Sequence, residues 1–368
     1  MGASAFKDLA ALRLDGNPVW EPIAPRTPPT ARDQVAVSLA PGARSLIAFG
    51  GFGSGGFPGA PDAGTHLADA WRLRLGGGWR DATARTGAAA PLHWEAAAVA
   101  SDPRTGRMFM VGGLEGDSEL GDAWVAEPGR HGRVGWRQLC SPGSCGEAPA
   151  PRWGGHTVYD PDDDRVILFG GRRTDRTSFG DVWALSLAGA PRWTRLDVAG
   201  EAPAPRWGGA AGYDPVGRRM LLAGGQTGSD AGAVGHADAW ALSLDGTPAW
   251  HRLAPARTGP APRRSAAYAV RTAGDTVELL LSGGLQAATG AHYNDVWSLA
   301  LDGPDGTWRE LSPSDCSAAA VPACRRSAGA VYDPRGDRLV LVFGRDAERF
   351  YGDAWAFDVG AARWRPLG

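Results

Sequence analysis

Lysine and long apolar runs are nearly absent from this sequence. Lys7 is the only lysine, so arginine supplies almost all of the positive charge, and the net charge of the 368 residues is −2. A chain without a basic excess is not expected to bind nucleic acid. No apolar run reaches the length of a membrane span, so we expect no membrane insertion. Residues 1–14 lack the basic head and apolar centre of a signal peptide, so an exported protein would have lost its signal from this sequence.

Cysteine is scarce as well, and its four residues form two close pairs, Cys140/Cys145 and Cys316/Cys324. A zinc site needs four converging ligands, and no histidine accompanies either pair, so we expect no metal. Two local disulfides are the simpler interpretation, and they predict an oxidising compartment, extracellular or periplasmic. Free thiols are the alternative and would indicate a cytoplasmic protein. We expect no cofactor.

Glycine (54 residues) and proline (28 residues) are abundant, by contrast, and predict many turns. No stretch indicates a helix. Apolar runs end in Gly-Gly at five places, and a sixth copy, "LVLVFGR", ends at Arg345, which we align with a missing second glycine. An Asp-x-Trp and then a second tryptophan follow each copy, with a period of fifty to sixty residues. The Asp-x-Trp pairs are Asp69/Trp71, Asp122/Trp124, Asp181/Trp183, Asp238/Trp240, Asp295/Trp297 and Asp353/Trp355.

Each repeat predicts four short strands, a to d, separated by turn residues. Strand a follows a Pro-Arg element and strand b is the apolar run. Strand c carries the Asp-x-Trp, and strand d begins at the second tryptophan. A sheet this small buries both of its faces only by stacking against other copies around an axis. The sequence therefore predicts an all-β chain of stacked four-stranded units.

The order Gly-Gly, Asp-x-Trp, second tryptophan, Pro-Arg-x-x-His resembles the kelch repeat. The resemblance covers nearly the whole chain in six copies and is that of a bacterial-type kelch protein, with no specific member indicated. It implies a kelch-type β-propeller. The chain departs from the repeat at two positions: Arg345 replaces a glycine, and His93 replaces the arginine of Pro-Arg.

Residues 1–29 make an incomplete copy. "FKDLAALRLDGNPVWEPI" aligns with "HADAWALSLDGTPAWHRL", which places Asp8 on Asp238 and Trp20 on Trp250. We therefore expect an N-terminal c–d half module that forms one domain with the propeller of residues 30–368. Six complete blades are favoured. Seven blades are the alternative, because the chain could begin inside a seventh blade.

Three tryptophans depart from the repeat. Thirteen of the 16 follow it and are expected to be scaffold, whereas Trp94, Trp153 and Trp207 share one position at the start of strand a. Around the propeller this position gives a second ring, namely Asp33, Trp94, Trp153, Trp207, Arg264 and Arg326. The position before it gives a first ring, namely Arg32, His93, Arg152, Arg206, Arg263 and Arg325.

In kelch propellers the start of strand a faces the ligand, so the resemblance implies that both rings surround one end of the channel. Arginine binds carboxylate or phosphate through a planar fork, and tryptophan offers a flat apolar face. We therefore expect a binding module for an anionic or sugar-like ligand, which could be a small anionic molecule, a glycan or an acidic peptide. The structural alternatives are that the first ring braces loops and that the tryptophans plug the channel.

The alternative function is an enzyme of the isomerase, lyase or cyclase type that uses the same end of the channel on a small anionic substrate. Such an enzyme needs an acid–base pair. The candidates near both rings are Asp33, His93, Glu95 and Glu115.

Overall fold

The structure is a computed structural model, and it describes residues 9–13, 19–23, 28–40, 42, 44–54, 64–75, 77–83, 91, 95–129, 133–229, 232–303 and 305–367. For residues 9–13, 19–23, 54, 64 and 65 it describes the backbone alone. His93 and Trp94 lie outside the described residues.

The described residues form six four-stranded antiparallel sheets, the blades of a β-propeller, and no helix. Blade 1 is β4 (Ala36–Leu39), β5 (Ser45–Phe49), β8 (Ala70–Arg74) and β9 (Trp79–Asp81). Blade 2 is β10 (Ala98–Ser101), β11 (Met108–Glu115), β12 (Ser118–Pro128) and β13 (Val134–Cys140). Blade 3 is β14 (His156–Asp160), β15 (Arg165–Phe169), β16 (Val182–Ser186) and β17 (Arg192–Arg195).

The remaining blades have the same order of strands. Blade 4 is β18 (Ala210–Asp214), β19 (Arg219–Ala223), β22 (Ala239–Ser243) and β23 (Ala249–Leu253). Blade 5 is β24 (Ala267–Ala273), β25 (Thr276–Gln286), β26 (Ala291–Ala300) and β27 (Thr307–Ser312). Blade 6 is β28 (Gly329–Asp333), β29 (Arg338–Val342), β30 (Ala354–Asp358) and β31 (Arg363–Pro366). Short strands extend two b–c loops, namely β3 (Arg32–Asp33), β6 (Phe52–Ser54) and β7 (Gly64–His66) in blade 1 and β20 (Gln226–Thr227) and β21 (Val234–Gly235) in blade 4.

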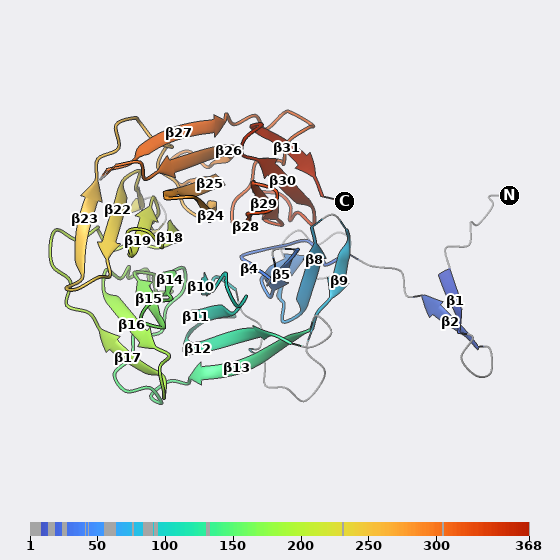
Figure 1. Cartoon of the computed structure of the whole chain (residues 1–368), viewed down its shortest axis with the longest axis horizontal. Helices are drawn as coiled ribbons and strands as arrows, with labels where there is room; N and C mark the ends of the chain where they lie inside the picture. Colours follow the sequence, from blue (N-terminus) through green and yellow to red (C-terminus); the bar gives the residue numbers. More distant parts are fainter. Residues whose placement is uncertain are drawn as a thin grey trace.

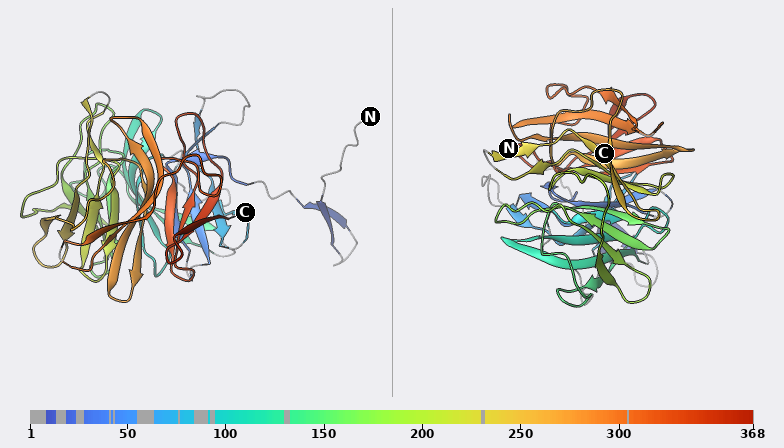
Figure 2. Two further views of the ribbon diagram at one scale, coloured as in Figure 1. Left: turned by 90° about the horizontal axis from the view of Figure 1, so that it is seen from above. Right: turned by 90° about the vertical axis from the view of Figure 1, so that its left-hand side faces the viewer.

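The innermost strands β4, β10, β14, β18, β24 and β28 each contact the next around a central axis (Figure 1). The side views show the blades stacked around that axis as a short cylinder (Figure 2). Each blade contains its own strands a to d, so the ring closes between blades 6 and 1 without exchange of a strand. The prediction of an all-β, six-bladed kelch-type propeller is confirmed.

Apolar cores lie between the blades, one cluster at each of the six interfaces. At three interfaces the second tryptophan of one blade packs on a phenylalanine of the preceding blade. The ring centroids of Trp250 and Phe169 lie 5.0 Å apart, and those of Trp136 and Phe49 lie 4.2 Å apart. Since each blade is buried on both faces, the repeated tryptophans act as the inter-blade scaffold.

The sixth Gly-Gly site differs from the sequence alignment. Phe343 and Gly344 have φ of +62° and +96°, which match Gly170 and Gly171 of blade 3 at +66° and +99°. Phe343 therefore replaces the first glycine of the pair, and Arg345 follows the pair instead of replacing its second member. The alignment missed this because the apolar run of strand b continues into Phe343 without a break.

The N-terminal hairpin of β1 (Leu9–Arg13) and β2 (Val19–Ile23) pairs only with itself, with Leu12 opposite Trp20. This agrees with two adjacent strands in the incomplete copy. Its assignment as a c–d half module in one domain with the propeller stays a prediction.

Both cysteine pairs form disulfides, Cys140–Cys145 and Cys316–Cys324, as predicted. Each bond closes a short d–a loop. These loops lead into strand a of blades 3 and 6, which follow Arg152 and Arg325 of the first ring.

Candidate functional site

The first-ring arginines are buried and hold the loops of their own blades. In blade 3, Nη1 and Nη2 of Arg152 lie 2.5 and 2.9 Å from the two carboxylate oxygens of Asp181, and Nη1 also donates to the carbonyl oxygen of Gly170. The other pairs are Arg32–Asp69, Arg206–Asp238, Arg263–Asp295 and Arg325–Asp353. Each of these arginines is at most 5 % exposed. Because their donors are occupied within the chain, these arginines hold loops in place and do not offer hydrogen bonds to a ligand.

Blade 2 has no such clamp among the described residues, and its aspartate shows the consequence. Asp122 accepts a hydrogen bond from Nε1 of Trp124, but its Oδ1 has no partner among the described residues. Burial raises the pKa of Asp122. In Asp181 the effect of burial is outweighed by the hydrogen bonds and charge of Arg152, so the pKa of that carboxyl is lowered.

The residues that follow the second ring form a ring of backbone hydrogen bonds around the channel. They have left-handed backbones with φ between 51° and 67°, and they are Gln34, Ala96, Gly154, Gly208, Ser265 and Ser327. Five of their amides donate to the equivalent carbonyl of the preceding blade at 2.7–2.9 Å. Glycine adopts this backbone without strain, which accounts for the first glycine of Trp-Gly-Gly. The second glycine has no room for a side chain: a Cβ on Gly209 would lie 2.9 Å from Nε2 of His156.

Glu95, and not Trp94, occupies the second ring in blade 2. In every other blade the second-ring residue forms an antiparallel bridge with the residue after Gly-Gly, as Trp153 does with Arg172. In blade 2 this bridge joins Glu95 to Leu114. The sequence alignment was one residue off here, because "PLHWEA" has no Pro-Arg pair to fix its register. We use the name mouth for Asp33, Glu95, Trp153, Trp207, Arg264 and Arg326, together with the bridge partners Arg172 and Arg345.

The two described mouth tryptophans interleave with two arginines. Cζ of Arg172 and Cζ of Arg264 lie 4.9 and 4.8 Å from the ring of Trp207, and Cζ of Arg172 lies 4.8 Å from the ring of Trp153. Trp207 is only 5 % exposed and donates from Nε1 to the carbonyl of Gly228 at 3.0 Å. Trp153 is half-buried, and its Nε1 has no partner among the described residues. Trp207 therefore fills part of the mouth, whereas Trp153 presents a surface to it.

The mouth also brings two carboxyl groups together with its arginines. Asp33 is 3 % exposed, and its Oδ1 has no hydrogen-bond partner among the described residues. Burial raises the pKa of Asp33 to about 7 against the opposing charges of Arg345 and Arg326. Burial, and then the charge of Asp33, raise the pKa of Glu95 to about 7 as well. Both carboxyl groups are therefore poised to gain or lose a proton near neutral pH.

The mouth arginines repel one another. Burial and the charges of Arg326 and Arg172 lower the pKa of Arg264 to about 10. Burial and Arg345 lower the pKa of Arg326. Nε of Arg264 and Nε of Arg326 are buried without a hydrogen-bond partner among the described residues. This part of the mouth therefore holds positive charge that the described carboxylates do not neutralise at ion-pair distance.

Histidines flank the mouth on two blades. Nδ1 of His66 lies 3.8 Å from a carboxylate oxygen of Glu95. Burial and the charge of Arg326 lower the pKa of His292. Glu115, which sequence analysis named as an acid–base candidate, is an exposed residue at the tip of β11.

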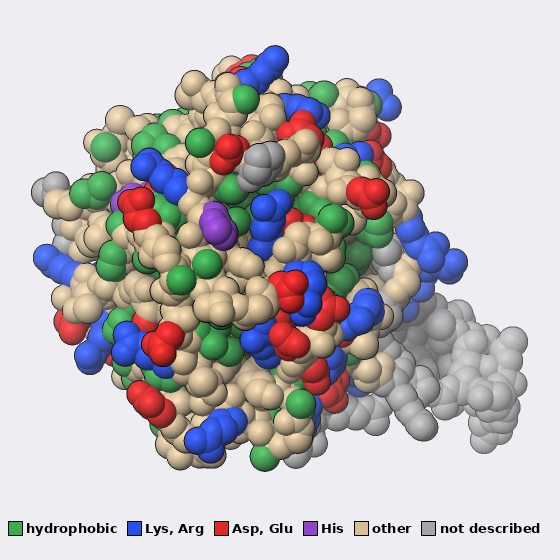
Figure 3. All heavy atoms as spheres, turned by 60° about the vertical axis from the view of Figure 1, so that its left-hand side comes forward, with side chains coloured by type: hydrophobic (Ala, Val, Ile, Leu, Met, Phe, Trp, Pro, Cys, Tyr) green, Lys and Arg blue, Asp and Glu red, His purple; other side chains and the backbone are tan. Residues whose placement is uncertain are grey.

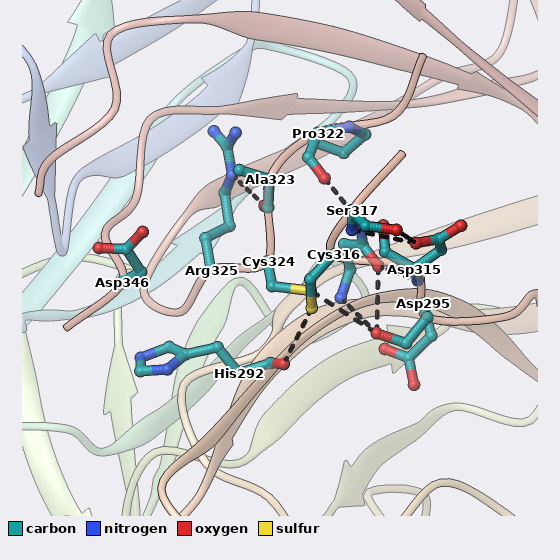
Figure 4. The surroundings of a disulfide bond; sticks show 12 residues. His292, Asp295, Asp315, Cys316, Ser317, Pro322, Ala323, Cys324, Arg325 and Asp346 are labelled. Atoms are coloured by element: carbon teal, nitrogen blue, oxygen red, sulfur yellow. Dashed lines mark hydrogen bonds between the residues drawn. A yellow bond between two sulfur atoms is a disulfide. The ribbon is translucent and has the colours of Figure 1, made fainter. Parts of the chain in front are cut away.

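The disulfide of blade 6 fixes the approach to the mouth. Figure 4 shows that Cys324 directly precedes Arg325, with the carbonyl of His292 beside the bond. Asn294 Nδ2 donates to the carbonyls of Pro322 and Asp315 at 2.7 and 2.9 Å. The loop that delivers Arg326 is thus held by a covalent bond and by buried hydrogen bonds.

Outside the mouth, charges are mixed. On the face drawn in Figure 3, acidic and basic side chains are interspersed among small hydrophobic patches. Among the described residues no three histidine, cysteine or acidic side chains gather in a way that could hold a metal ion. Nor does that part of the chain contain a helix long and apolar enough to cross a membrane.

Comparisons with known proteins identify the repeat. A family model described as "KLHDC2/KLHL20/DRC7 Kelch-repeats domain" matches residues 134–333. The chain is 38 % identical over 44 % of its length to the serine/threonine-protein phosphatase BSL2 of Arabidopsis thaliana, of which it covers 15 %. It is 29 % identical over 61 % of its length to the flagellar outer arm dynein alpha chain of Chlamydomonas reinhardtii, of which it covers 5 %.

Adagio-like protein 3 of Oryza sativa subsp. japonica is 27 % identical over 61 % of the chain, which covers 35 % of that protein. The chain therefore spans about a third or less of each of these relatives. All three are eukaryotic proteins, so they lend no support to a bacterial type.

Proposed function

The chain belongs to the kelch-repeat family, whose propellers are binding and interaction modules, and we propose that it binds an anionic, sugar-like ligand at the mouth. The observation that carries this proposal is the set of arginines on blades 3, 5 and 6. Arg264 and Arg326 have no ion-pair partner within 4.0 Å among the described residues. Leaving half-buried cations without a counter-charge is costly, and a ligand carboxylate or phosphate would supply that charge.

The aromatic side of the mouth suits the body of such a ligand. Trp153 is half-buried beside the arginines, and its Nε1 lacks a partner among the described residues. An indole face packs on the apolar face of a sugar ring. Trp207 acts mainly as a support, because it is buried between Arg172 and Arg264.

Isothermal titration calorimetry tests the proposal. The probes are glucuronate, sialic acid, glucose 6-phosphate and an acidic peptide, with glucose as the uncharged control. We expect Arg264→Gln and Arg326→Gln each to weaken anion binding about tenfold, because arginine is among the residues that contribute most to binding energy at interfaces. Arg309→Gln, which changes an exposed arginine of β27, should leave binding unchanged. Equal loss in all three variants, or no anion bound by the native chain, would contradict the proposal.

An enzyme at the same mouth is the second candidate, and the two carboxyl groups favour it. The pKa values of Asp33 and Glu95 near 7 are those that acid–base catalysis of an isomerase, lyase or cyclase reaction requires. The test follows the same sugar acids by NMR in D2O. Hydrogen exchange or conversion that Glu95→Gln abolishes, with anion binding retained, supports the enzyme. Anion binding without any exchange leaves a binding module.

The two disulfides support an extracellular or periplasmic location, because such bonds persist in oxidising compartments. Thiol labelling of the denatured, unreduced protein from its native source is the test. Labelling of all four cysteines would contradict this location.

A further inference from the structure

The six inner strands enclose a channel that the mouth does not account for. Its cavity measures about 1030 Å³. The described residues that line it include no Asp, Glu, Lys or His, and the only charged ones are Arg104 and Arg335, in the turns between strands a and b. Most of the remaining lining residues are alanine, valine, glycine, proline and tyrosine. The channel is therefore an apolar cavity below a charged mouth.

Alternate residues of each strand a face this channel. In β4, Val37 and Leu39 are half-buried while their neighbours Ala36 and Ser38 are buried between blades. Strand β28 repeats the alternation, with Ala330 half-buried on the channel side. Side chains along a strand point to opposite faces, and both faces of strand a pack against inter-blade clusters. The apolar wall is formed by the parts of Val37, Leu39 and Ala330 that this packing leaves exposed to the channel.

The two ends of the channel differ. The backbone ring of Gln34 to Ser327 borders it on the mouth side, and the a–b turns border it on the other side. Three tyrosines stand near these turns, and their hydroxyls donate to turn carboxylates: Tyr159 to Asp164, Tyr213 to Asp162 and Tyr332 to Asp337, at 2.7, 3.1 and 2.8 Å. With the hydroxyls held by the turns, the half-buried rings of Tyr213 and Tyr332 give the open end aromatic surface, while the Tyr159 ring is buried against Phe109.

We propose that this channel is a second binding site, which takes one uncharged, hydrocarbon-rich small molecule through the end formed by the a–b turns. Its volume is that of pockets which hold small organic ligands. Apolar cavities attract apolar guests because water finds few hydrogen-bond partners in them. A cationic guest would meet no carboxylate among the described lining residues, and an anionic guest would meet only Arg104 and Arg335 in the turns at the entrance. Any charged guest would lose its hydration deeper in the channel, so the channel and the mouth select different ligands.

The test uses N-phenyl-1-naphthylamine, an uncharged dye that fluoresces in apolar surroundings. We expect saturable binding of one dye per chain, with energy transfer from Trp153 and Trp207, which line the channel. Ala330→Phe and Ala97→Phe place a ring in the channel from blades 6 and 2, and each should weaken dye binding at least about tenfold. Ala361→Phe is the matched control, because Ala361 is exposed in the turn between β30 and β31.

Each outcome decides. Dye affinity equal to the native value in either channel variant, with a melting temperature within about 3 °C of the native one, overturns the proposal. No dye binding by the native chain also overturns it. If a filled variant does not fold, Tyr268→Ala widens the channel instead, and an unchanged dye affinity there counts against the site. Glucuronate at saturation should not displace the dye, and displacement would place the dye at the mouth.

Discussion

At the scale of single residues, His156 shows how an inter-blade contact depends on protonation. Its Nε2 accepts a hydrogen bond from the amide of Gly209 at 2.8 Å, so Nδ1 carries the proton and donates to the carbonyl of Phe169 at 3.1 Å. The ring is buried, and burial lowers the pKa of His156 to about 4. The neutral form therefore joins blades 3 and 4, and protonation would break the bond to Gly209.

The stability of the protein should consequently fall with acid. The unfolded His156 titrates near 6.5 and the folded one near 4, so between these values the unfolded chain binds more protons. As the pH falls through this window, the free energy of unfolding decreases by about 1.4 kcal/mol for each pH unit, and by about 3 kcal/mol in all. Urea unfolding at several pH values measures the slope. His156→Gln should flatten it, whereas His251→Gln, which changes an exposed histidine, should not. Identical slopes in all three proteins would contradict this assignment.

Anion binding at the mouth should strengthen as the pH falls through 7. Asp33 and Glu95 have pKa values raised to about 7, and their protonation removes negative charge beside Arg345. Affinity for glucuronate, which stays ionised, should therefore be higher at pH 6 than at pH 8. Titration calorimetry at both pH values measures the difference, and the double variant Asp33→Asn/Glu95→Gln should abolish it. An affinity that rises with pH would contradict the proposed electrostatics.

Only part of this residue-level picture could be predicted from the sequence. The composition of the second ring was visible because Trp153, Trp207, Arg264 and Arg326 follow regular Pro-Arg or Arg-Arg signals. In blade 2 the sequence alignment put Trp94 in the second ring instead of Glu95, because that blade lacks the Pro-Arg signal. The burial of Trp207 between two arginines was not predictable, since Arg172 and Arg264 come from other strands and meet it only through the fold.

At the scale of elements, the arginine–aspartate clamp ties the start of strand a to strand c in five of the six blades, counting the described residues. Blade 2 serves as a natural comparison. Asp181 is paired with Arg152, and its pKa is lowered, whereas the pKa of the unclamped Asp122 is raised. The same position of the repeat therefore favours the ionised carboxylate in blade 3, at Asp181, and disfavours it in blade 2, at Asp122.

Neutralising these two aspartates should have different effects. Asp181→Asn leaves the buried Arg152 without its counter-charge and should cost about 3 kcal/mol or more. Asp122→Asn removes a charge that burial disfavours, and it should cost less than about 1 kcal/mol. Urea unfolding of both variants measures the difference. Equal destabilisation would mean that blade 2 contains a counter-charge equivalent to Arg152.

The strands themselves were largely predictable, because apolar runs that end in Gly-Gly, turn residues and the Asp-x-Trp pairs mark their positions. Register within the loops was less so. Phe343 continues an apolar run, so nothing in the sequence shows that the chain turns there with a positive φ. In blade 3 the equivalent residue is Gly170, where a Cβ would lie 2.5 Å from the carbonyl oxygen of Arg206. The sequence therefore gives no reason to expect a phenylalanine at this position of blade 6, and only the structure shows it there.

At the scale of the whole molecule, the ring closes between blade 6 and blade 1, the last and the first blades along the sequence. Between blades 6 and 1, Phe343 stacks on Trp79 with centroids 5.1 Å apart, and the amide of Gly344 donates to the carbonyl of Arg32 at 2.8 Å. Equivalent glycine amides of blades 2 to 5 donate to the next blade in the same way, and a phenylalanine–tryptophan contact also joins blades 1 and 2 and blades 3 and 4. Those blades are in addition connected by the chain itself. The closing interface is therefore held by packing and backbone hydrogen bonds without a connecting loop, and Phe343 is its most buried aromatic residue at 0 % exposed.

Phe343→Gly sets two effects against each other at this interface. It restores the glycine of the repeat and relieves a positive φ, which is worth about 1 kcal/mol or slightly more. It also deletes a fully buried ring, which costs about 3–5 kcal/mol. We therefore expect a net loss of about 2–3 kcal/mol in urea unfolding, because packing outweighs backbone strain.

The double variant Val342→Phe/Phe343→Gly separates the ring from its position. Val342 is the equivalent of Phe49 and Phe169, which precede glycine in blades 1 and 3 and pack on the tryptophan of the next blade. Moving the ring there should let it meet Trp79 without a positive φ and should recover at least half of the loss. A double variant that is no more stable than Phe343→Gly would contradict this expectation. It would mean that the ring reaches Trp79 only from position 343, so that the interface between blades 6 and 1 requires the positive φ of that residue.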